Sequence, residues 1–285
     1  MNTLTWLDNL PPALERHGVV LRRLLAAVEC DPRWRLLELS SSVARGAGDA
    51  DSDLDLGLGA DDDAWPQVLA DVPSLVGGLG EVVDTLHHRI PEWGDRPHQR
   101  TFVQYANGVQ VDLMAYPASL RGKGRPPDTV VLYDPDGRLA RQWLPSVYQA
   151  DAATVREWTF LGWTALADTA KYLRRGSAWE ALERLQQART HVWRLWAVAQ
   201  SAAYPGFGLT TVLDAPDVGL PPGIEATVAG LDLRDLHRAA LACATLLDQT
   251  ARLAAPIVGA DLPTAMATFV CQQLDSLTAE DDLDG

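Results

Sequence analysis

The chain has no long apolar run. Hydrophobic residues make up 47% of its 285 residues and charged residues 22%. No stretch reaches the roughly eighteen consecutive apolar residues that a membrane-spanning helix needs. The first ten residues carry Asp8 and no basic cluster ahead of an apolar segment, so they do not resemble a signal peptide. We therefore expect a cytoplasmic protein without a membrane segment.

Cysteine is scarce, and the familiar nucleophilic and phosphate-binding patterns are missing. Cys30, Cys243 and Cys271 lie far apart and match no zinc spacing, so we interpret them as buried, reduced thiols. The neighbours His87 and His88 would point to opposite faces of a strand and could not easily share one metal ion. No Ser-His-Asp or Cys-His arrangement stands out, and no Walker loop is present.

Positive charge is also in short supply. Lys and Arg total 24 against 38 Asp and Glu, a formal net charge of -14. This balance disfavours long nucleic acid as a substrate and favours a cationic partner. Lysine occurs only as Lys123 and Lys171. Lys171, on a predicted helix, either reaches across a cleft to a triphosphate or, with Arg174 and Arg175, complements the negative end of that helix.

The first half of the chain mixes a helical pattern with strand patterns. Apolar residues recur at helical spacing over 11–29, and a shorter helix is predicted over 64–76. Asn107-Gly108 predicts a tight hairpin turn, with Val111 and Leu113 on one face of the following strand and Asp112 on the other. Strands are predicted over 33–39, 53–58, 81–86, 101–105, 109–116 and 130–133.

After about residue 150 the pattern is helical. Gly176 is placed to end one helix, and Ser177 with Glu180 forms a potential capping box for the next. Helices are predicted over 152–174, 178–203, 233–255 and 263–277, with a long loop over 204–223 and a frayed acidic tail over 280–285. The predicted class is α+β: a mixed-sheet domain over residues 1–150, followed by a helical bundle over 151–285.

Three aspartates are the strongest candidates for chemistry. Asp53 and Asp55 are two apart in a strand pattern, so both carboxylates leave one face while Leu54 and Leu56 enter the core. Asp112 would supply a third carboxylate from a strand beside theirs. Magnesium prefers such hard oxygen ligands, and phosphoryl or nucleotidyl transfer uses them. The alternative is that these acids are only solvated, because the surrounding segment is acidic throughout.

The loop before these aspartates makes the pattern more specific. Ser41-Ser42-Val43-Ala44-Arg45-Gly46 is followed, after five residues, by Ser52-Asp53-Leu54-Asp55. This order resembles the motif of the DNA polymerase beta-type nucleotidyltransferase superfamily, which reads Gly-Ser, Ala-Arg-Gly and Ser-Asp-x-Asp. Ser41 stands where that family has glycine. The layout of a sheet domain and a helical half further resembles the antibiotic (aminoglycoside) nucleotidyltransferases.

The resemblance implies a function and a set of site residues. Ser41, Ser42, Arg45 and Ser52, with the loop backbone, would hold ATP, and Lys171 is added as a further nucleotide contact. Asp53, Asp55 and Asp112 would bind Mg²⁺, with Asp112 also the general base. The implied reaction transfers AMP from ATP to a hydroxyl of a small cationic antibiotic, such as an aminoglycoside, and releases pyrophosphate.

Two other functions remain open from the sequence. One is a protein-nucleotidylating, antitoxin-like partner, although such chains are usually short single domains and this one has about 130 further residues. The other is a catalytically weak nucleotide-binding regulator, because a serine in place of glycine narrows the space for phosphate or demands a different backbone angle. The sequence indicates no particular oligomeric state.

Overall fold

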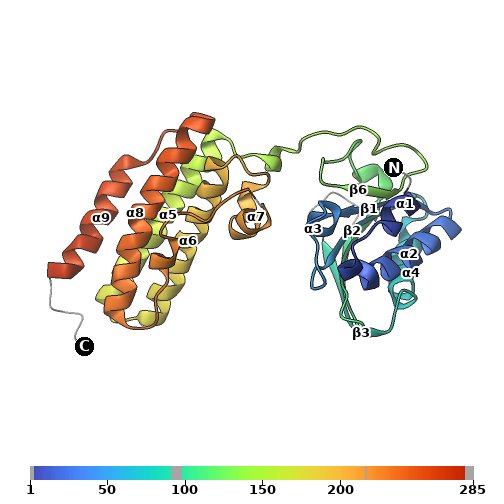
Figure 1. Cartoon of the computed structure of the whole chain (residues 1–285), viewed down its shortest axis with the longest axis horizontal. Helices are drawn as coiled ribbons and strands as arrows, with labels where there is room; N and C mark the ends of the chain where they lie inside the picture. The colour runs from blue at the N-terminus through green and yellow to red at the C-terminus, as the bar shows by residue number, and fades with distance from the viewer. Residues whose placement is uncertain (1–2, 91–97, 216, 280–285) are drawn as a thin grey trace. The chain divides into compact units, whose positions relative to one another are not determined.

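The chain folds into two compact units, Met1–Leu144 and Pro145–Gly285. We describe them from a computed structural model that covers residues 3–90, 98–215 and 217–279. The predicted α+β class is confirmed: the first unit contains a six-stranded mixed sheet, and the second is helical (Figure 1). The tail over 280–285, which we predicted to be frayed, lies outside the described residues.

The sheet of the first unit has the strand order β3-β4-β5-β2-β1-β6. β2 and β5 run parallel, whereas every other neighbouring pair is antiparallel. The parallel pair brings together segments more than fifty residues apart in the sequence, which hairpins alone would not do. The strands are β1 Trp34–Ser40, β2 Leu54–Ala60, β3 Val82–Ile90, β4 His98–Tyr105, β5 Gln110–Pro117 and β6 Val130–Tyr133.

One face of this sheet packs on helices and forms the main core of the unit. The helices are α1 Thr3–Asp8, α2 Glu15–Cys30 and α4 Trp65–Gly77. Leu21 and Leu24 of α2 and Val68 of α4 are fully buried against strand residues such as Leu54 and Leu113. Because side chains alternate along a strand, this packing turns Asp55 and Asp112 to the opposite face.

The turn between β4 and β5 forms as its sequence predicts. Gly108 has a φ of +88°, and the Asn107 side chain accepts a hydrogen bond from the Val109 amide at 3.1 Å. Along β5, Val111 and Leu113 are buried whereas Asp112 is only half-buried. The predicted assignment of faces on this strand is therefore confirmed.

A buried charge pair fastens the segment after β5 to the second face of the sheet. Arg121 donates to both carboxylate oxygens of Glu38, from Nε at 2.7 Å and from a terminal nitrogen at 2.9 Å. The Tyr116 hydroxyl donates to the same carboxylate at 2.9 Å. Because the charge is paired and hydrogen-bonded, the cost of burying Glu38 is offset. Burial, reinforced by Glu38, raises the pKa of Tyr116 well above its ordinary value.

The second unit is a bundle in which α5 packs on α6, α8 and α9. Gly162 lets α5 approach α8 closely, because a Cβ there would lie 2.8 Å from a methyl carbon of Leu247. Trp163 is buried in the same core. The helices are α5 Ala152–Arg174, α6 Ala178–Ala199, α7 Leu209–Asp214, α8 Leu233–Val258 and α9 Thr264–Ala279.

Some local predictions for this unit are confirmed and others are wrong. Gly176, at φ +69°, follows the end of α5. The Ser177 side chain makes no capping hydrogen bond to the start of α6, so the predicted capping box does not form. The segment predicted as a loop over 204–223 contains α7. All three cysteines are free, but only Cys243 is buried, and Cys30 is exposed.

No helix among the described residues combines the length and apolar character that crossing a bilayer requires.

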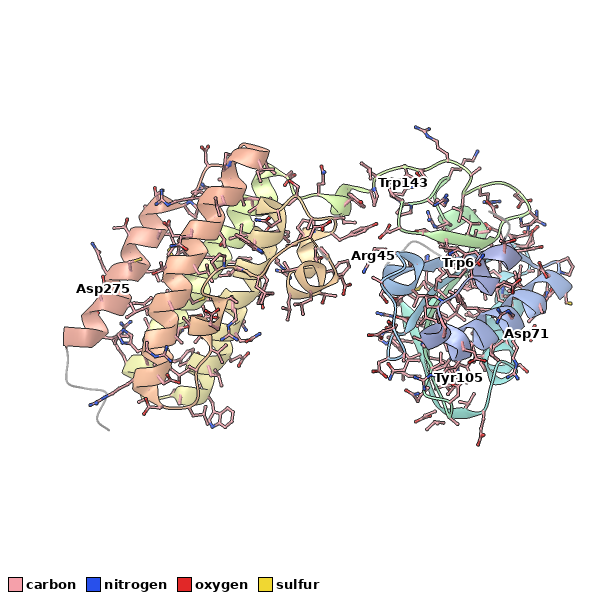
Figure 2. All side chains as sticks on the ribbon, in the orientation of Figure 1. Trp6, Arg45, Asp71, Tyr105, Trp143 and Asp275 are labelled. Carbon is pink, nitrogen blue, oxygen red and sulfur yellow. The ribbon has the colours of Figure 1, made fainter. Side chains whose placement is uncertain are left out.

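The Tyr105 hydroxyl provides a test of the sheet–helix packing. Tyr105, labelled in Figure 2, is buried. Its hydroxyl donates to the Val76 carbonyl of α4 at 2.8 Å. Tyr105→Phe removes this buried hydrogen bond, while the Val76 carbonyl keeps its backbone donor, the Leu79 amide at 3.2 Å, so we expect a loss of about 0.5 to 1.5 kcal/mol in the free energy of unfolding at neutral pH. Chemical denaturation of the two proteins measures the difference.

The same pair of proteins should respond differently to alkali. Burial raises the pKa of Tyr105 to about 12, from 10.0. Above pH 10 the unfolded chain ionises at this tyrosine while the folded chain does not, so the wild-type advantage should shrink as pH rises toward 12. An advantage that stays constant over this range would contradict the assignment.

Candidate active site

The parallel pairing of β2 with β5 sets two aspartates side by side. In its register Asp55 lies opposite Asp112, with Leu54 opposite Val111 and Leu56 opposite Leu113. The leucines and the valine are buried on the helix-covered face. Both carboxylates therefore leave the other face of the sheet, at the start of each strand.

Asp53 comes directly before β2, so it lies just outside the strand in which we predicted it. Its side chain is exposed, whereas that of Asp55 is half-buried. Burial is the largest cause of a raised pKa at Asp55, and the negative charges of Asp53 and Asp112 add to it. The charges of Asp53 and Asp112 thus both act on Asp55, and a cation beside Asp55 would relieve that repulsion.

Ser41 occupies a backbone conformation that suits glycine. Its φ is +63°, in the left-handed region that a residue with a Cβ enters at a cost of about 1 to 2 kcal/mol. The Ser41 side chain donates a hydrogen bond to the Asp55 carboxylate, which opposes the rise of the pKa of Asp55. The serine thus combines a strained backbone with a contact to a candidate metal ligand.

Helix α2 holds the loop that leads from α3, Ser41–Ala44, to Asp53. Arg16 donates to the Ala50 carbonyl at 2.6 Å and to the Asn107 carbonyl of the β4–β5 turn at 2.8 Å. Nε2 of the buried His17 lies 2.8 Å from the Ser52 carbonyl. Two consecutive helix residues therefore fix the backbone immediately before Asp53.

Two of the predicted nucleotide contacts serve the loop itself. The Ser52 hydroxyl lies 3.2 Å from a carboxylate oxygen of Asp49 and accepts from the Asp49 amide at 2.9 Å. The Ser42 carbonyl accepts from the Ala47 amide at 3.0 Å, and its side chain is half-buried. Ser52 therefore lies next to Asp53 before β2, whereas Ser42 lies in α3, at the other end of the loop.

The predicted basic contacts have acidic partners. Arg45 lies 3.9 Å from the Asp128 carboxylate, within the first unit. Lys171 belongs to the second unit, where it pairs with Asp168 and lies 4.6 Å from the centre of the Tyr172 ring. The structure gives Lys171 local partners on its own helix, and its role as a nucleotide contact stays a prediction.

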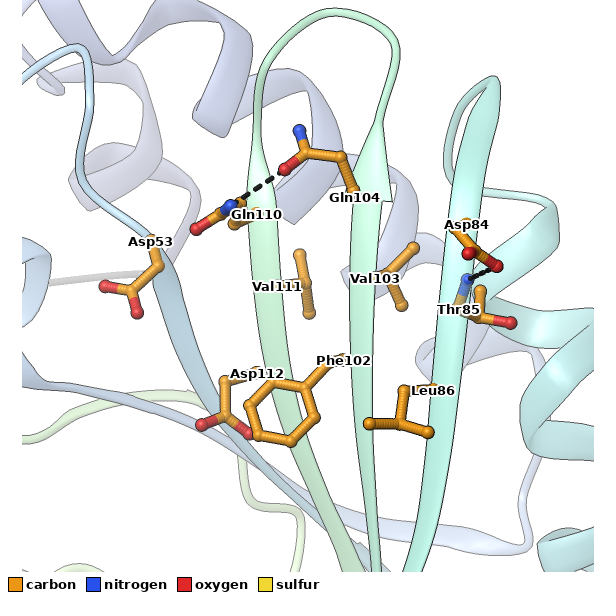
Figure 3. A pocket seen from close by; sticks show the side chains of 10 residues that line it. All are labelled: Asp53, Asp84, Thr85, Leu86, Phe102, Val103, Gln104, Gln110, Val111 and Asp112. Carbon is orange, nitrogen blue, oxygen red and sulfur yellow. Dashed lines mark hydrogen bonds between the residues drawn. The ribbon is translucent and has the colours of Figure 1, made fainter.

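A cavity of about 540 Å³ lies on the open face of the sheet beside the aspartates. Figure 3 shows Asp53 and Asp112 along one side and the Phe102 ring next to Asp112. Phe102 is the residue of β4 opposite Asp112 in the register. The cavity is lined by Asp53, Asp84, Thr85, Leu86, Phe102, Val103, Gln104, Gln110, Val111 and Asp112.

The third carboxylate already has a cation beside it. Nε of Arg100 donates to the two carboxylate oxygens of Asp112 at 2.9 and 3.1 Å, and a terminal nitrogen contacts the second oxygen as well. Arg100 belongs to β4, and its guanidinium carbon lies 4.5 Å from the centre of the Phe102 ring. Its positive charge also acts on Asp55.

The donor set fits a hard divalent cation such as Mg²⁺, because Asp53 and Asp55 offer carboxylate oxygens and Asp53 is open to solvent. Asp112, by contrast, is bound to Arg100. Within the ranges that the structure covers, no three His, Cys, Asp or Glu side chains gather as a metal site. The arrangement thus provides two available carboxylates and a third that is occupied by a guanidinium.

Sequence reasoning missed Arg100, Arg16 and His17. Arg100 could have been found from the predicted hairpin, because the register from Asn107-Gly108 places it two residues from the partner of Asp112, on the same face. No comparable signal marks Arg16 and His17, since their contacts depend on where α2 crosses the loop.

Comparison with known proteins gives structural neighbours but no sequence relative. No protein-family model and no curated protein matches the chain. One structural neighbour is an aminoglycoside 6-adenyltransferase from Bacillus subtilis, 12% identical, with a TM-score of 0.40 over 91% of this chain and 98% of that one. Another is a nucleotidyltransferase-like protein from Exiguobacterium sibiricum, 13% identical, with a TM-score of 0.37 over 90% of this chain and 88% of that one.

The strain at Ser41 can be measured with two substitutions. Ser41→Gly and Ser41→Ala both remove the hydroxyl that contacts Asp55, but only alanine keeps a Cβ at the positive φ. We expect the glycine variant to be more stable than the alanine variant by about 1 to 2 kcal/mol. Equal free energies of unfolding in urea would show that the backbone at residue 41 is not left-handed.

Proposed function

We propose that this protein is a magnesium-dependent nucleotidyltransferase that moves AMP from ATP to a hydroxyl of a small cationic antibiotic, such as an aminoglycoside. Pyrophosphate is the second product. The observation that supports the proposal is the pairing of Asp55 with Asp112 across β2 and β5, with Asp53 directly before β2, beside an acid-lined cavity on the open sheet face.

The residues of the site have different roles in the proposed reaction. Asp53 and Asp55 hold the divalent cation, which neutralises charge on the phosphates and on the group being transferred. Ser42 and Ser52 border the loop whose backbone holds the triphosphate. Asp112 accepts the proton of the acceptor hydroxyl and orients that hydroxyl for attack on the α-phosphorus. The pyrophosphate then leaves as the P–O bond to it breaks.

The chemistry of the cavity favours a cationic, partly apolar acceptor. Asp53 and Asp84 line it, together with Asp112, whose charge Arg100 offsets, and none of the described residues that line it is basic. Leu86 and Phe102 add apolar surface, on which the face of a sugar ring can lie. The net charge of -14 strengthens attraction of an amine-bearing molecule and opposes long nucleic acid. A cytoplasmic setting and nucleotide contacts from Arg45 and Lys171 stay predictions.

The aspartates can be tested directly. Asp53→Asn and Asp55→Asn should each lower nucleotidyl transfer by more than about 100-fold, because several kcal/mol of metal-dependent transition-state stabilisation are lost. The measurement is pyrophosphate release with saturating ATP and Mg²⁺ across a panel of aminoglycosides.

Asp51→Asn is the matched control, because it removes the same charge from an exposed position two residues before Asp53. It should keep near wild-type turnover. Without metal, Asp55→Asn should not lower the melting temperature, since the raised pKa of Asp55 means that its ionised form destabilises the fold. Near wild-type transfer by both metal-ligand variants would overturn the assignment.

If the acceptor is cationic, Asp84 should contribute to its binding. This exposed carboxylate lines the cavity from β3, apart from the candidate catalytic aspartates at β2 and β5. Asp84→Asn should raise the KM for an aminoglycoside several-fold and leave the KM for ATP unchanged. The aminoglycoside KM of the wild type should also rise between about 20 and 150 mM salt, as charges are screened. Efficient transfer to a neutral acceptor, and to no aminoglycoside at any salt concentration, would contradict the cationic class alone.

A further inference from the structure

Arg100 binds the Asp112 carboxylate in the way that a metal ion would bind it. Its guanidinium contacts both carboxylate oxygens, and its Nε hydrogen bonds measure 2.9 and 3.1 Å. A bidentate pair of this kind fixes both the charge and the plane of the carboxylate. A metal ion that bound Asp112 would share these oxygens with the guanidinium and would lie against its positive charge, so it would have to displace the guanidinium.

The position of Arg100 is set by the sheet. β4 pairs with β5, and Arg100 lies opposite Met114, one step along the face from the pair formed by Phe102 and Asp112. The guanidinium lies against the Phe102 ring, a cation–π contact that holds it over the sheet. The Arg100 side chain is 43% exposed and that of Asp112 only 15%, so the pair is open to solvent mainly on the arginine side.

The charges at this site balance with a single divalent ion. Asp53, Asp55 and Asp112 carry three negative charges when ionised, and Arg100 contributes one positive charge that reaches Asp55 as well as Asp112. The remaining two negative charges match one Mg²⁺. A second divalent ion would leave the cluster with excess positive charge, unless the nucleotide compensated for it.

We propose that Arg100 takes the place of a second divalent cation at Asp112, so that the site holds one metal ion, on Asp53 and Asp55. The inference deepens the proposed function and rests on it for the identity of the metal ligands. A carboxylate has about four lone-pair positions. The bidentate arginine therefore leaves Asp112 able to accept a hydrogen bond from the acceptor hydroxyl while its charge stays neutralised.

The test counts Mn²⁺ ions bound to the full-length protein without nucleotide, by electron paramagnetic resonance of free Mn²⁺ and by calorimetry. The wild type should bind about one ion per chain. Arg100→Gln should bind about two, or bind Mn²⁺ at least about tenfold more tightly, because Asp112 is then available. Arg100→Gln combined with Asp112→Asn should return the count to about one.

Arg89→Gln is the matched control. It removes one positive charge from an exposed residue of β3, and it lies on the opposite sheet face, since its neighbour His88 is the residue paired with Arg100. It should leave the Mn²⁺ count and affinity at wild-type values. Arg100→Lys keeps the charge without the planar fork, so it supplies a second variant should the glutamine variant fold poorly. It should bind Mn²⁺ more tightly than the wild type.

The outcomes separate this inference from the proposed function. If the wild type binds two ions, or if neither Arg100 variant changes the count or the affinity, Arg100 does not replace a metal and the inference is wrong. Transfer that depends on Asp53 and Asp55 would then still support the nucleotidyltransferase. If the wild type binds no Mn²⁺ and shows no transfer, both proposals fail together.

Discussion

The parallel pairing of β2 with β5 is the constraint on which the candidate site depends. It joins segments that are distant in the sequence, and its register places Asp55 beside Asp112. The register itself is held by the core, because sliding β2 by one residue would turn Leu54 and Leu56 away from the helices, and sliding β5 would do the same to Val111 and Leu113. Burial of apolar side chains on one face thus fixes the carboxylates on the other, where they repel one another.

Two side chains of the protein partly offset that repulsion. Arg100 neutralises Asp112, and the Ser41 hydroxyl donates to Asp55. Each contact has a cost or a limit: Ser41 holds a left-handed backbone, and Arg100 remains substantially exposed. Asp53 receives no such partner among the described residues, which leaves the exposed end of the cluster for a cation from solution.

The sequence predicted regular elements better than side-chain partners. β6 and α5 have the predicted bounds, because alternation and helical periodicity are local signals, and the Asn107-Gly108 turn formed for the same reason. The short helix α7 was not predicted, because its six residues are too few to show a clear helical periodicity of apolar side chains. The superfamily motif that the sequence resembles has glycine at the position of Ser41, so the sequence alone marked this serine as unusual. Only the structure gave its φ. The contacts of Arg16 and His17 depend on tertiary placement, which no local pattern encodes.

The most direct measurement is diffraction from crystals grown with Mn²⁺ and a non-hydrolysable ATP analogue, with anomalous differences recorded to locate the metal. We expect a Mn²⁺ peak roughly 2.0 to 2.2 Å from carboxylate oxygens of both Asp53 and Asp55, with the phosphates of the analogue beside it. A nucleotide bound elsewhere, or a metal that contacts neither Asp53 nor Asp55, would contradict the claim that these aspartates form the centre of a nucleotidyltransferase site.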